Sequence, residues 1–327
     1  MYSGGRSKVT GRGCATALRA KITREVHRVY NFEGMSLSKR ARYGTYILAC
    51  SWALASELPV RVYSIADGLR STSVNRIGAD SKGFLWLSTS DGAARFDGYR
   101  FLNFSLGDGL SNRRVNDVLE TRSGAIWVAT AGGLCRLGKA PGSAPAVERE
   151  YLPPGSHWIS RLLEPRSSSA AATVLWCGTD SGLFRFTPQD GKFQRVALES
   201  TPPGRDPFIF DLYEDRSSNL WAGTDEGLYQ FTGDTQAARY TVRQGLPAKQ
   251  VTAVRQDSSG KIWAATWQGA ARLSEGRADL VLNRANGLAG DYLYSLLPLS
   301  NGDLWFGGVG GVTVTDAAGV EIGRAHV

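Results

Sequence analysis

The segment VTAVRQDSSGKIWAATWQG, residues 251–269, contains the pattern that decides the fold. Val251 and a second valine three residues later precede a polar turn, and Trp263 follows in a second apolar stretch. Thr266 comes three residues after this tryptophan, and Gly269 comes six residues after it. Short apolar stretches bounded by turn residues predict β-strands rather than helices.

The same pattern occurs six times along the chain. The tryptophans are separated by 41 to 49 residues: Trp86, Trp127, Trp176, Trp221, Trp263 and Trp305. A glycine follows each by six residues: Gly92, Gly133, Gly182, Gly227, Gly269 and Gly311. Five of them have a threonine at the third position, namely Thr89, Thr130, Thr179, Thr224 and Thr266, and Gly308 takes that place in the sixth. A period near 42 residues with turn signals at each junction is typical of β-propeller blades.

An apolar pair precedes each tryptophan and predicts the first strand of each blade: Val74/Ile77, Val115/Val118, Ile159/Leu162, Ile209/Leu212, Val251/Val254 and Leu293/Leu296. The residue two after each tryptophan lies on the same face of its strand and is always small: Ser88, Ala129, Gly178, Gly223, Ala265 and Gly307. We expect the neighbouring sheet to approach there, with the indole filling the space between the sheets. An arginine recurs nine residues after four tryptophans, at Arg95, Arg136, Arg185 and Arg272, and predicts hydrogen bonds between blades.

The fold class predicted is therefore all-β, a β-propeller of six four-stranded blades within residues 56–320. The blade repeats are 67–107, 108–155, 156–204, 205–244, 245–286 and 287–320. Residues 60–65 have the character of a fourth strand, so we expect them to close the ring by completing the last blade. Six blades can close alone or belong to a seven-bladed ring that lacks one blade, and we favour the incomplete ring.

Charge argues against a nucleic-acid partner. The chain has a formal net charge of +8. Residues 1–43 hold ten basic and two acidic side chains, and the rest of the chain holds 28 of each sign. The positive balance therefore belongs to the leader, and the predicted propeller offers no net field that would attract a polyanion.

Residues 35–55 are predicted to be a signal peptide. A basic stretch is followed by an apolar run from Tyr46 to Ala55 that ends in Ala-Leu-Ala, a pattern that signal peptidase cleaves. An uncleaved anchor, a buried helix or a lipoprotein box at Cys50 are the alternatives. We interpret residues 1–34 as a non-native upstream extension, with translation starting at Met35. The predicted location is periplasmic or extracytoplasmic.

No cofactor or metal site is predicted. Cys135 and Cys177 are the cysteines beyond the leader, and two buried thiols are favoured over a disulfide between neighbouring repeats. The only histidine between the leader and the last two residues is His157, which we interpret as a surface or structural residue. It alone could serve a catalytic triad, so the sequence predicts no catalytic residue.

Ligand binding is the function class that is left. The loops before each first strand and the turns after each tryptophan strand share one face of a propeller, which we call the loop face. The candidate ligand-binding residues on this face are Arg70, Asp91, Arg113, Arg114, Asp180, Asp225, Glu226, Trp267 and Gln268. Trp267 is a second aromatic in a turn where other repeats carry smaller residues. It predicts either a platform for a sugar or another flat ligand, or a turn residue packed on its own blade. Mixed charges suit a small polar ligand such as an oligosaccharide.

The repeat is similar to that of the two-component regulator propeller family. The shared pattern is V-x-x-I-x-x-D-x-x-G-x-x-W-x-x-T-x-x-G after an Asp-Gly-Leu segment. This segment is present as Asp67-Gly68-Leu69 and Asp108-Gly109-Leu110, and in shortened form at Gly245-Leu246 and Gly287-Leu288. Repeats three and four instead carry Gly155-Ser156 and Gly204-Arg205, so their leading loops are expected to differ.

The resemblance implies the ligand-sensing part of a histidine kinase or diguanylate cyclase that is anchored in the membrane. In such receptors a β-sandwich, a transmembrane helix and the cytoplasmic output module follow the propeller, and the parent protein can be a homodimer. We interpret residues 321–327, EIGRAHV, as a translated sequencing adapter at the end of a truncated reading frame. A protein-interaction scaffold is the alternative function, and a propeller lyase or glycosidase comes third.

Overall fold

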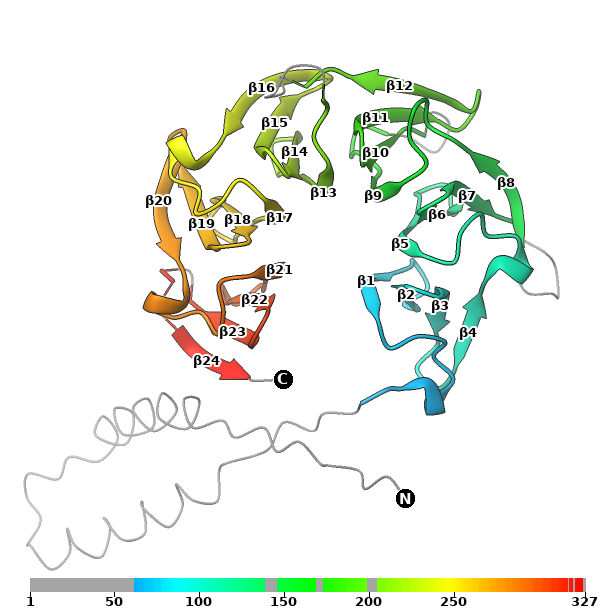
Figure 1. Cartoon of the computed structure of the whole chain (residues 1–327), viewed down its shortest axis with the longest axis horizontal. Coiled ribbons are helices and arrows are strands. Elements are labelled where there is room, and N and C mark those ends of the chain that lie inside the picture. The colour runs from blue at the N-terminus through cyan, green and yellow to red at the C-terminus, as the bar shows by residue number, and fades with distance from the viewer. Residues whose placement is uncertain are drawn as a thin grey trace, which may run out of the picture.

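The strands form six four-stranded antiparallel sheets arranged as blades around a common centre (Figure 1). The structure, a computed structural model, describes residues 62–138, 146–168, 173–198, 205–316, 318–319 and 321–325. In every blade the strands pair in chain order, and the first strand lies innermost. The all-β fold class and the six four-stranded blades are confirmed. The predicted leader and signal peptide, residues 1–55, lie outside the described residues.

The first three blades comprise β1 (Val74–Ala79), β2 (Leu85–Thr89), β3 (Gly92–Phe96), β4 (Phe101–Phe104); β5 (Val115–Glu120), β6 (Ile126–Thr130), β7 (Gly133–Leu137), β8 (Val147–Tyr151); and β9 (Ile159–Leu163), β10 (Leu175–Thr179), β11 (Gly182–Thr187), β12 (Lys192–Val196). The last three comprise β13 (Ile209–Glu214), β14 (Asn219–Thr224), β15 (Gly227–Thr232), β16 (Thr235–Tyr240); β17 (Val251–Gln256), β18 (Ile262–Thr266), β19 (Gly269–Ser274), β20 (Arg277–Leu282); and β21 (Leu293–Pro298), β22 (Leu304–Gly308), β23 (Gly311–Thr315), β24 (Glu321–Ala325).

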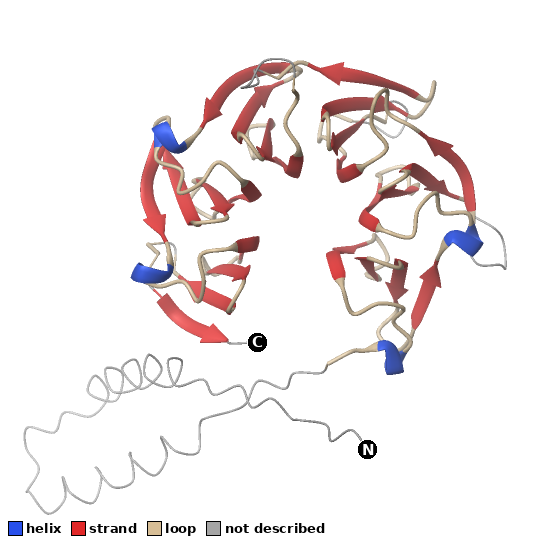
Figure 2. Ribbon diagram, in the orientation of Figure 1, coloured by secondary structure: helices blue, strands red, loops and turns tan. Residues whose placement is uncertain are grey.

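Short helical turns lead into four of the blades (Figure 2): η2 (Ile65–Asp67), η3 (Leu106–Asp108), η4 (Val242–Gln244) and η5 (Arg284–Asn286). They lead into blades one, two, five and six, the repeats that open with Gly-Leu. In the first three turns this glycine ends the turn at a φ of 92° to 97°, a conformation that favours glycine. Blades three and four have no such turn among their described residues, so their leading loops differ as expected.

Packing between blades follows the tryptophan pattern. Trp127 lies 5.4 Å from Phe186 of the next blade, and Trp263 lies 5.7 Å from Phe306 of the next blade, between ring centroids. A Cβ added at Gly178 would lie 2.7 Å from Ile209 Cγ2 in the neighbouring blade. The small residue beside the indole therefore admits the adjacent sheet, as the sequence predicted.

The turn after each tryptophan strand is closed by the recurring threonine and glycine. The five threonine hydroxyls donate to the carbonyl of the glycine three residues later at 2.7 to 3.0 Å. The six glycines have φ between 102° and 133°, which favours glycine. At Gly133 an added Cβ would also lie 2.9 Å from the carbonyl oxygen of Tyr151, so two constraints act at this position.

An aspartate six residues before the tryptophan fixes the indole. Trp86, Trp221 and Trp263 donate from Nε1 to Asp80, Asp215 and Asp257 at 3.0, 2.8 and 2.9 Å. Burial opposes ionisation of the Asp215 and Asp257 carboxyls. Hydrogen bonds from the indole and from neighbouring turn residues outweigh burial and hold the pKa of both groups below its ordinary value.

The second blade lacks this aspartate. Thr121 occupies the position, and its hydroxyl pairs with Ser123 and the carbonyl of Ala125. Trp127 Nε1 is buried and has no hydrogen-bond partner among the described residues. An unpaired buried donor costs stability, so this blade keeps the packing of the repeat without its hydrogen bond.

The recurring arginines contact their own blades more than their neighbours. Strand pairing places Arg95, Arg136 and Arg272 opposite the tryptophan, and their guanidinium carbons lie 5.8 to 5.9 Å from the indole centroid. Arg185 bonds to the next blade as predicted, through Asp234 at 3.0 Å. Among the described residues Arg95 and Arg136 make no hydrogen bond to a neighbouring blade, so the prediction is wrong at these two positions, because the register favours cation–π stacking instead.

The predicted closing strand is also wrong. Residues 62–64 are not in a strand, and the helical turn η2 follows them. The sixth blade takes its own fourth strand, β24, which pairs with β23. The predicted propeller boundary at residue 320 therefore falls before the last strand of the sheet. The origin of residues 321–327 in an adapter stays a prediction.

The arc is open between the first and sixth blades (Figure 1). Val74, Ile77 and Leu85 of blade one are 38%, 59% and 40% exposed. Trp305 of blade six is 40% exposed, although the other five tryptophans of the pattern are at most 5% exposed. Side chains that a neighbouring blade covers elsewhere are thus uncovered at both ends. The incomplete seven-bladed ring stays a prediction, and these exposed faces support it.

Cys135 and Cys177 are buried free thiols, as predicted. Among the described residues, no helix has the length and hydropathy needed to cross a membrane.

We expect Trp263→Ala to destabilise the chain far more than Trp305→Ala. Trp263 is fully buried between two blades, so its loss should lower the free energy of unfolding by about 3–5 kcal/mol. Trp305 already contacts solvent, so its loss should cost less than half as much. Urea unfolding of both variants measures the difference, and equal losses would contradict the open arc.

Thr121→Asp should stabilise the chain by about 1 kcal/mol, because it gives Trp127 Nε1 an acceptor. A carboxylate whose pKa is lowered by folding contributes above its unfolded pKa of about 4, so the gain should vanish as the pH falls through the lower folded pKa. Urea unfolding at pH 7 and at pH 3 tests both statements. Thr121→Val is the matched control, and a gain in that variant would refute the role of the carboxylate.

Candidate functional site: the loop face

Three charged candidate residues of blades one and two, Arg70, Asp91 and Arg113, form one ion-paired group on the loop face. Asp91 lies in the turn between β2 and β3. Its carboxylate pairs with Arg70 at 3.6 Å and with Arg113 at 3.3 Å. Both arginines precede the first strands of their blades and are exposed. Such surface pairs contribute little to stability, so these side chains are free to exchange partners.

The acidic candidates of blades three and four each have a local partner. Asp180 accepts a hydrogen bond from Ser156 Oγ at 2.5 Å. Asp225 accepts from Arg205 at 2.7 Å and from the backbone N–H of Phe208 at 2.8 Å. Glu226 pairs with Lys249 at 2.8 Å. These carboxylates fasten loops to turns, and they do not converge on a common point.

The remaining two candidates, Trp267 and Gln268, are neighbours in the turn after β18 but differ in their contacts. Gln268 is exposed, and its backbone N–H donates to Thr266 Oγ1 in closing the turn. Trp267 is half-buried and stacks on Tyr292 of the next blade, with ring centroids 5.0 Å apart and planes 20° apart. It also lies 6.1 Å from Phe210 of the preceding blade. Trp267 therefore bridges three blades, which neither of the two sequence interpretations described.

A continuous row of aromatic rings runs along the loop face from blade three to blade six. Successive centroids are 4.9 to 6.4 Å apart in the order Trp158, Phe208, Phe210, Trp267, Tyr292 and Tyr294. We call these six residues the aromatic row. Five are half-buried and Tyr294 is 58% exposed. At the other end Arg114, a candidate residue, lies with its guanidinium carbon 5.0 Å from the Trp158 ring.

Two residues of the aromatic row occupy a strand position that carries a hydrogen-bond donor in the other blades. The second residue of each first strand normally donates to the first residue of the next blade's inner strand. Asn75, Asn116, Ser160 and Thr252 do so at 2.5 to 2.8 Å. Phe210 and Tyr294 occupy this position in blades four and six and have no amide or aliphatic hydroxyl to donate in this way. Blade four has thus exchanged an inter-blade hydrogen bond for an aromatic surface.

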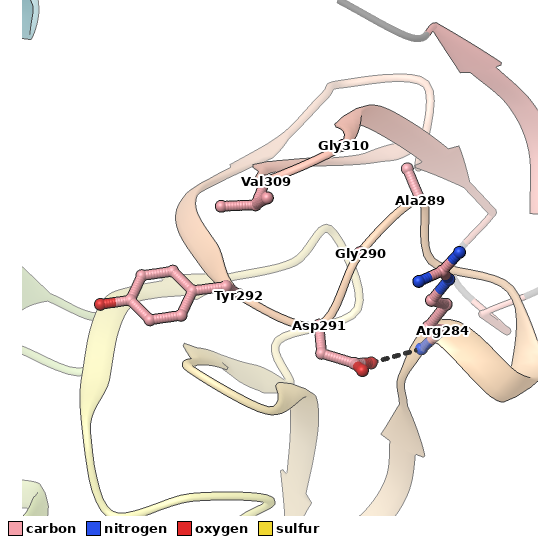
Figure 3. Close-up of a pocket in the computed structure, with 7 residues that line it drawn as sticks. All are labelled: Arg284, Ala289, Gly290, Asp291, Tyr292, Val309 and Gly310. Atoms are coloured by element: carbon pink, nitrogen blue, oxygen red, sulfur yellow. Dashed lines mark hydrogen bonds between the residues drawn. The ribbon is translucent and has the colours of Figure 1, made fainter.

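A pocket of about 380 Å³ adjoins the row at blade six (Figure 3). It is lined by Arg284, Ala289, Gly290, Asp291, Tyr292, Val309 and Gly310. Asp291 accepts a hydrogen bond from the backbone N–H of Arg284 at 2.6 Å, so its carboxylate is held beside the pocket. Burial and the neighbouring Tyr294 raise the pKa of the Tyr292 phenol, which stays protonated and can donate to a ligand oxygen.

Sequence reasoning identified Trp267 but missed the five rings beside it. A signal was present in the repeat alignment. Trp158, Phe208, Phe210, Tyr292 and Tyr294 all flank the first apolar residue of a first strand, where other blades carry Ser, Arg, Gln, Asn or Thr. The pocket residues Arg284 and Asp291 carried no signal, because their approach depends on how η5 leads into β21.

Solved structures identify the class of protein as a β-propeller. The extracellular domain described for a hybrid two-component system from B. thetaiotaomicron matches with a TM-score of 0.64 at 21% identity, over 79% of this chain and 35% of that chain. A catalytically inactive virginiamycin B lyase from Staphylococcus aureus with quinupristin matches with a TM-score of 0.62 at 13% identity, over 78% of this chain and 86% of that chain. Identities this low establish the fold alone.

The repeat type is identified from sequence. The model of the two-component regulator propeller matches residues 245–268, so this chain carries that repeat, and the resemblance is confirmed. A comparison with curated proteins gave no sequence match. This chain spans only 35% of the length of the B. thetaiotaomicron structure, so the activity of a longer parent enters only as a proposal.

Proposed function

We propose that this chain is the extracytoplasmic ligand-sensing propeller of a longer two-component receptor, and that it binds its ligand on the aromatic row. The regulator repeat and the shared fold with an extracellular two-component domain support the receptor role. In this proposal a β-sandwich, a membrane anchor and a kinase or diguanylate cyclase module belong to the parent, which acts as a homodimer. The chain itself performs no catalysis.

The observation that carries the ligand proposal is the aromatic row. Half-buried rings 5 to 6 Å apart offer flat apolar faces, and the hydrophobic faces of sugar rings stack on such surfaces. Polar groups at both ends, Arg114 and the Asp291 pocket, can hydrogen-bond to hydroxyls. A short neutral oligosaccharide fits this arrangement of stacking faces and polar ends better than a polyanion does.

The row also offers a physical route to signalling. It joins side chains from four blades, so a ligand lying along it would contact several blades at once. Between blades four and five the usual hydrogen bond from the second residue of the first strand is absent, because Phe210 occupies that position, and ring packing takes its place. A ligand that orders the rings would stiffen this junction and favour one arrangement of the propeller.

Thermal unfolding with neutral gluco-, xylo- and manno-oligosaccharides tests the proposal. A binding sugar at 100 times its dissociation constant should stabilise the native chain by about 2.7 kcal/mol. Trp267→Ala should lower the affinity at least tenfold, because it removes the central ring of the row. Tyr99→Ala is the matched control, since Tyr99 is an aromatic residue that is 90% exposed in the turn between β3 and β4.

Two outcomes would contradict the proposal. Protection by no sugar in the panel would favour the alternative of a protein-interaction scaffold. Equal affinity in the native chain and in Trp267→Ala would show that the ligand binds away from the aromatic row.

A further inference from the structure

A cluster of charged side chains lies among the inner strands of five successive blades. Its members are Arg76 on β1, Asp117 on β5, Arg161 on β9, Asp211 on β13 and Arg255 on β17. The first four occupy the same position, between the two apolar residues of the first strand, and alternate in sign. We call these five residues the central cluster. None of them belongs to the aromatic row or to the loop-face candidates.

The contacts within the central cluster extend beyond neighbouring blades. Arg76 pairs with Asp117 at 3.0 Å and also reaches Asp211, three blades away, at 3.4 Å. Arg161 and Arg255 pair with Asp211 at 3.2 and 2.6 Å. Asp211 therefore accepts from three arginines that come from three different blades. Such convergence requires the side chains to extend into the centre of the arc.

The two carboxylates of the central cluster are buried, whereas its three arginine side chains are partly exposed. The side chains of Asp117 and Asp211 are 4% and 1% exposed. Each also accepts a hydrogen bond from a backbone N–H of the next blade: Asp117 from Leu162 and Asp211 from Val254, both at 3.0 Å. The arginine side chains are 16% to 26% exposed. The surface that the cluster presents to solvent is therefore cationic.

The charges of the central cluster do not balance. Three arginines face two aspartates, which leaves one positive charge in a largely buried setting. Burial opposes ionisation of Asp211, but Arg255, Arg161 and Arg76 hold the pKa of its carboxyl far below the ordinary range. Burial lowers the pKa of Arg161, and repulsion from Arg76 lowers it further. An arginine stays charged under these conditions, so the repulsion persists.

The guanidinium group of Arg161 has N–H donors that are not used within the central cluster. Its only hydrogen-bond acceptor among the described residues is Asp211, which it contacts through Nε. Its two terminal nitrogens are thus available, and a guanidinium group matches a planar carboxylate in a two-point contact. A bound anion would satisfy these donors and offset the surplus charge at once.

We propose that the central cluster is a binding site for one monovalent oxyanion, a carboxylate group, held by Arg76, Arg161 and Arg255. The aspartates set the stoichiometry, because they neutralise two of the three arginines and leave the attraction for a single negative charge. Their pairing also fixes the directions of the guanidinium groups before the anion arrives. This site shares no residue with the aromatic row and does not rest on the proposed receptor function.

Thermal unfolding of the full chain in sodium acetate tests the site. Acetate replaces chloride step by step, so that the ionic strength stays constant. Acetate should raise the melting temperature of the native chain in a saturable manner. Arg161→Gln should weaken the apparent affinity at least tenfold, because one charge-assisted contact is worth about that factor. Arg272→Gln, which alters an arginine paired with Asp279 on an outer strand, is the matched control and should respond as the native chain does.

A second variant separates a binding site from a purely structural network. Asp117→Asn raises the surplus to two positive charges, so it should bind acetate more tightly even where it lowers the stability without acetate.

Glucuronate should be compared with acetate in the native chain and in Trp267→Ala. Equal protection assigns the site to free anions, and stronger protection that is lost in Trp267→Ala assigns it to a carboxylate on a sugar.

Failure is distinct for the two proposals. The oxyanion site would be overturned if neither acetate nor glucuronate raised the melting temperature in a saturable manner, or if Arg161→Gln responded as the native chain does. The central cluster would then have a structural role only. Neither result bears on neutral oligosaccharides. Equally, a chain that binds no neutral sugar can still bind acetate at the central cluster.

Discussion

The structure depends on the contact between one blade's tryptophan and the sheet of the next blade. A four-stranded sheet buries too little apolar surface to be stable alone, so each blade is completed by its neighbour. The indole fills the space between two sheets, and the small residue two positions later lets the second sheet come close. Trp263 between Ala265 and Phe306 shows both parts of this arrangement. The aspartate, threonine and glycine of the repeat hold the tryptophan strand in the orientation that this contact needs.

The same dependence explains where the molecule departs from regularity. At each end of the arc one blade face lies open, so Trp305 and Ile77 are exposed although their counterparts in the other blades are buried or half-buried. Within the arc, blade two tolerates an unpaired indole at Trp127, because packing against Phe186 keeps the ring in place. Blade four tolerates Phe210 where a hydrogen bond is usual. Inter-blade packing is thus strong enough to permit local losses.

The loop face and the centre of the arc use the inner strands in different ways. In blades three, four and six, aromatic residues that flank the first apolar residue of the inner strand contribute to the aromatic row. Four members of the central cluster immediately precede the second apolar residue of the inner strand, and Arg255 immediately follows it. A single repeated strand therefore supplies a stacking surface and a charged site from neighbouring positions.

The sequence by itself determined the blade. Tryptophan, glycine and apolar positions recur with a regular period, and each strand and turn of a blade is encoded within its own repeat. It also identified Trp267 as unusual. Only the tertiary structure decided which side chains from different blades meet: Trp267 with Phe210 and Tyr292, and Arg76 with Asp211 across three blades. It likewise decided that β24 is the fourth strand of the sixth sheet, whereas residues 62–64 are outside any strand. These outcomes depend on the angle between blades and on where the arc opens, and neither is encoded in any one repeat.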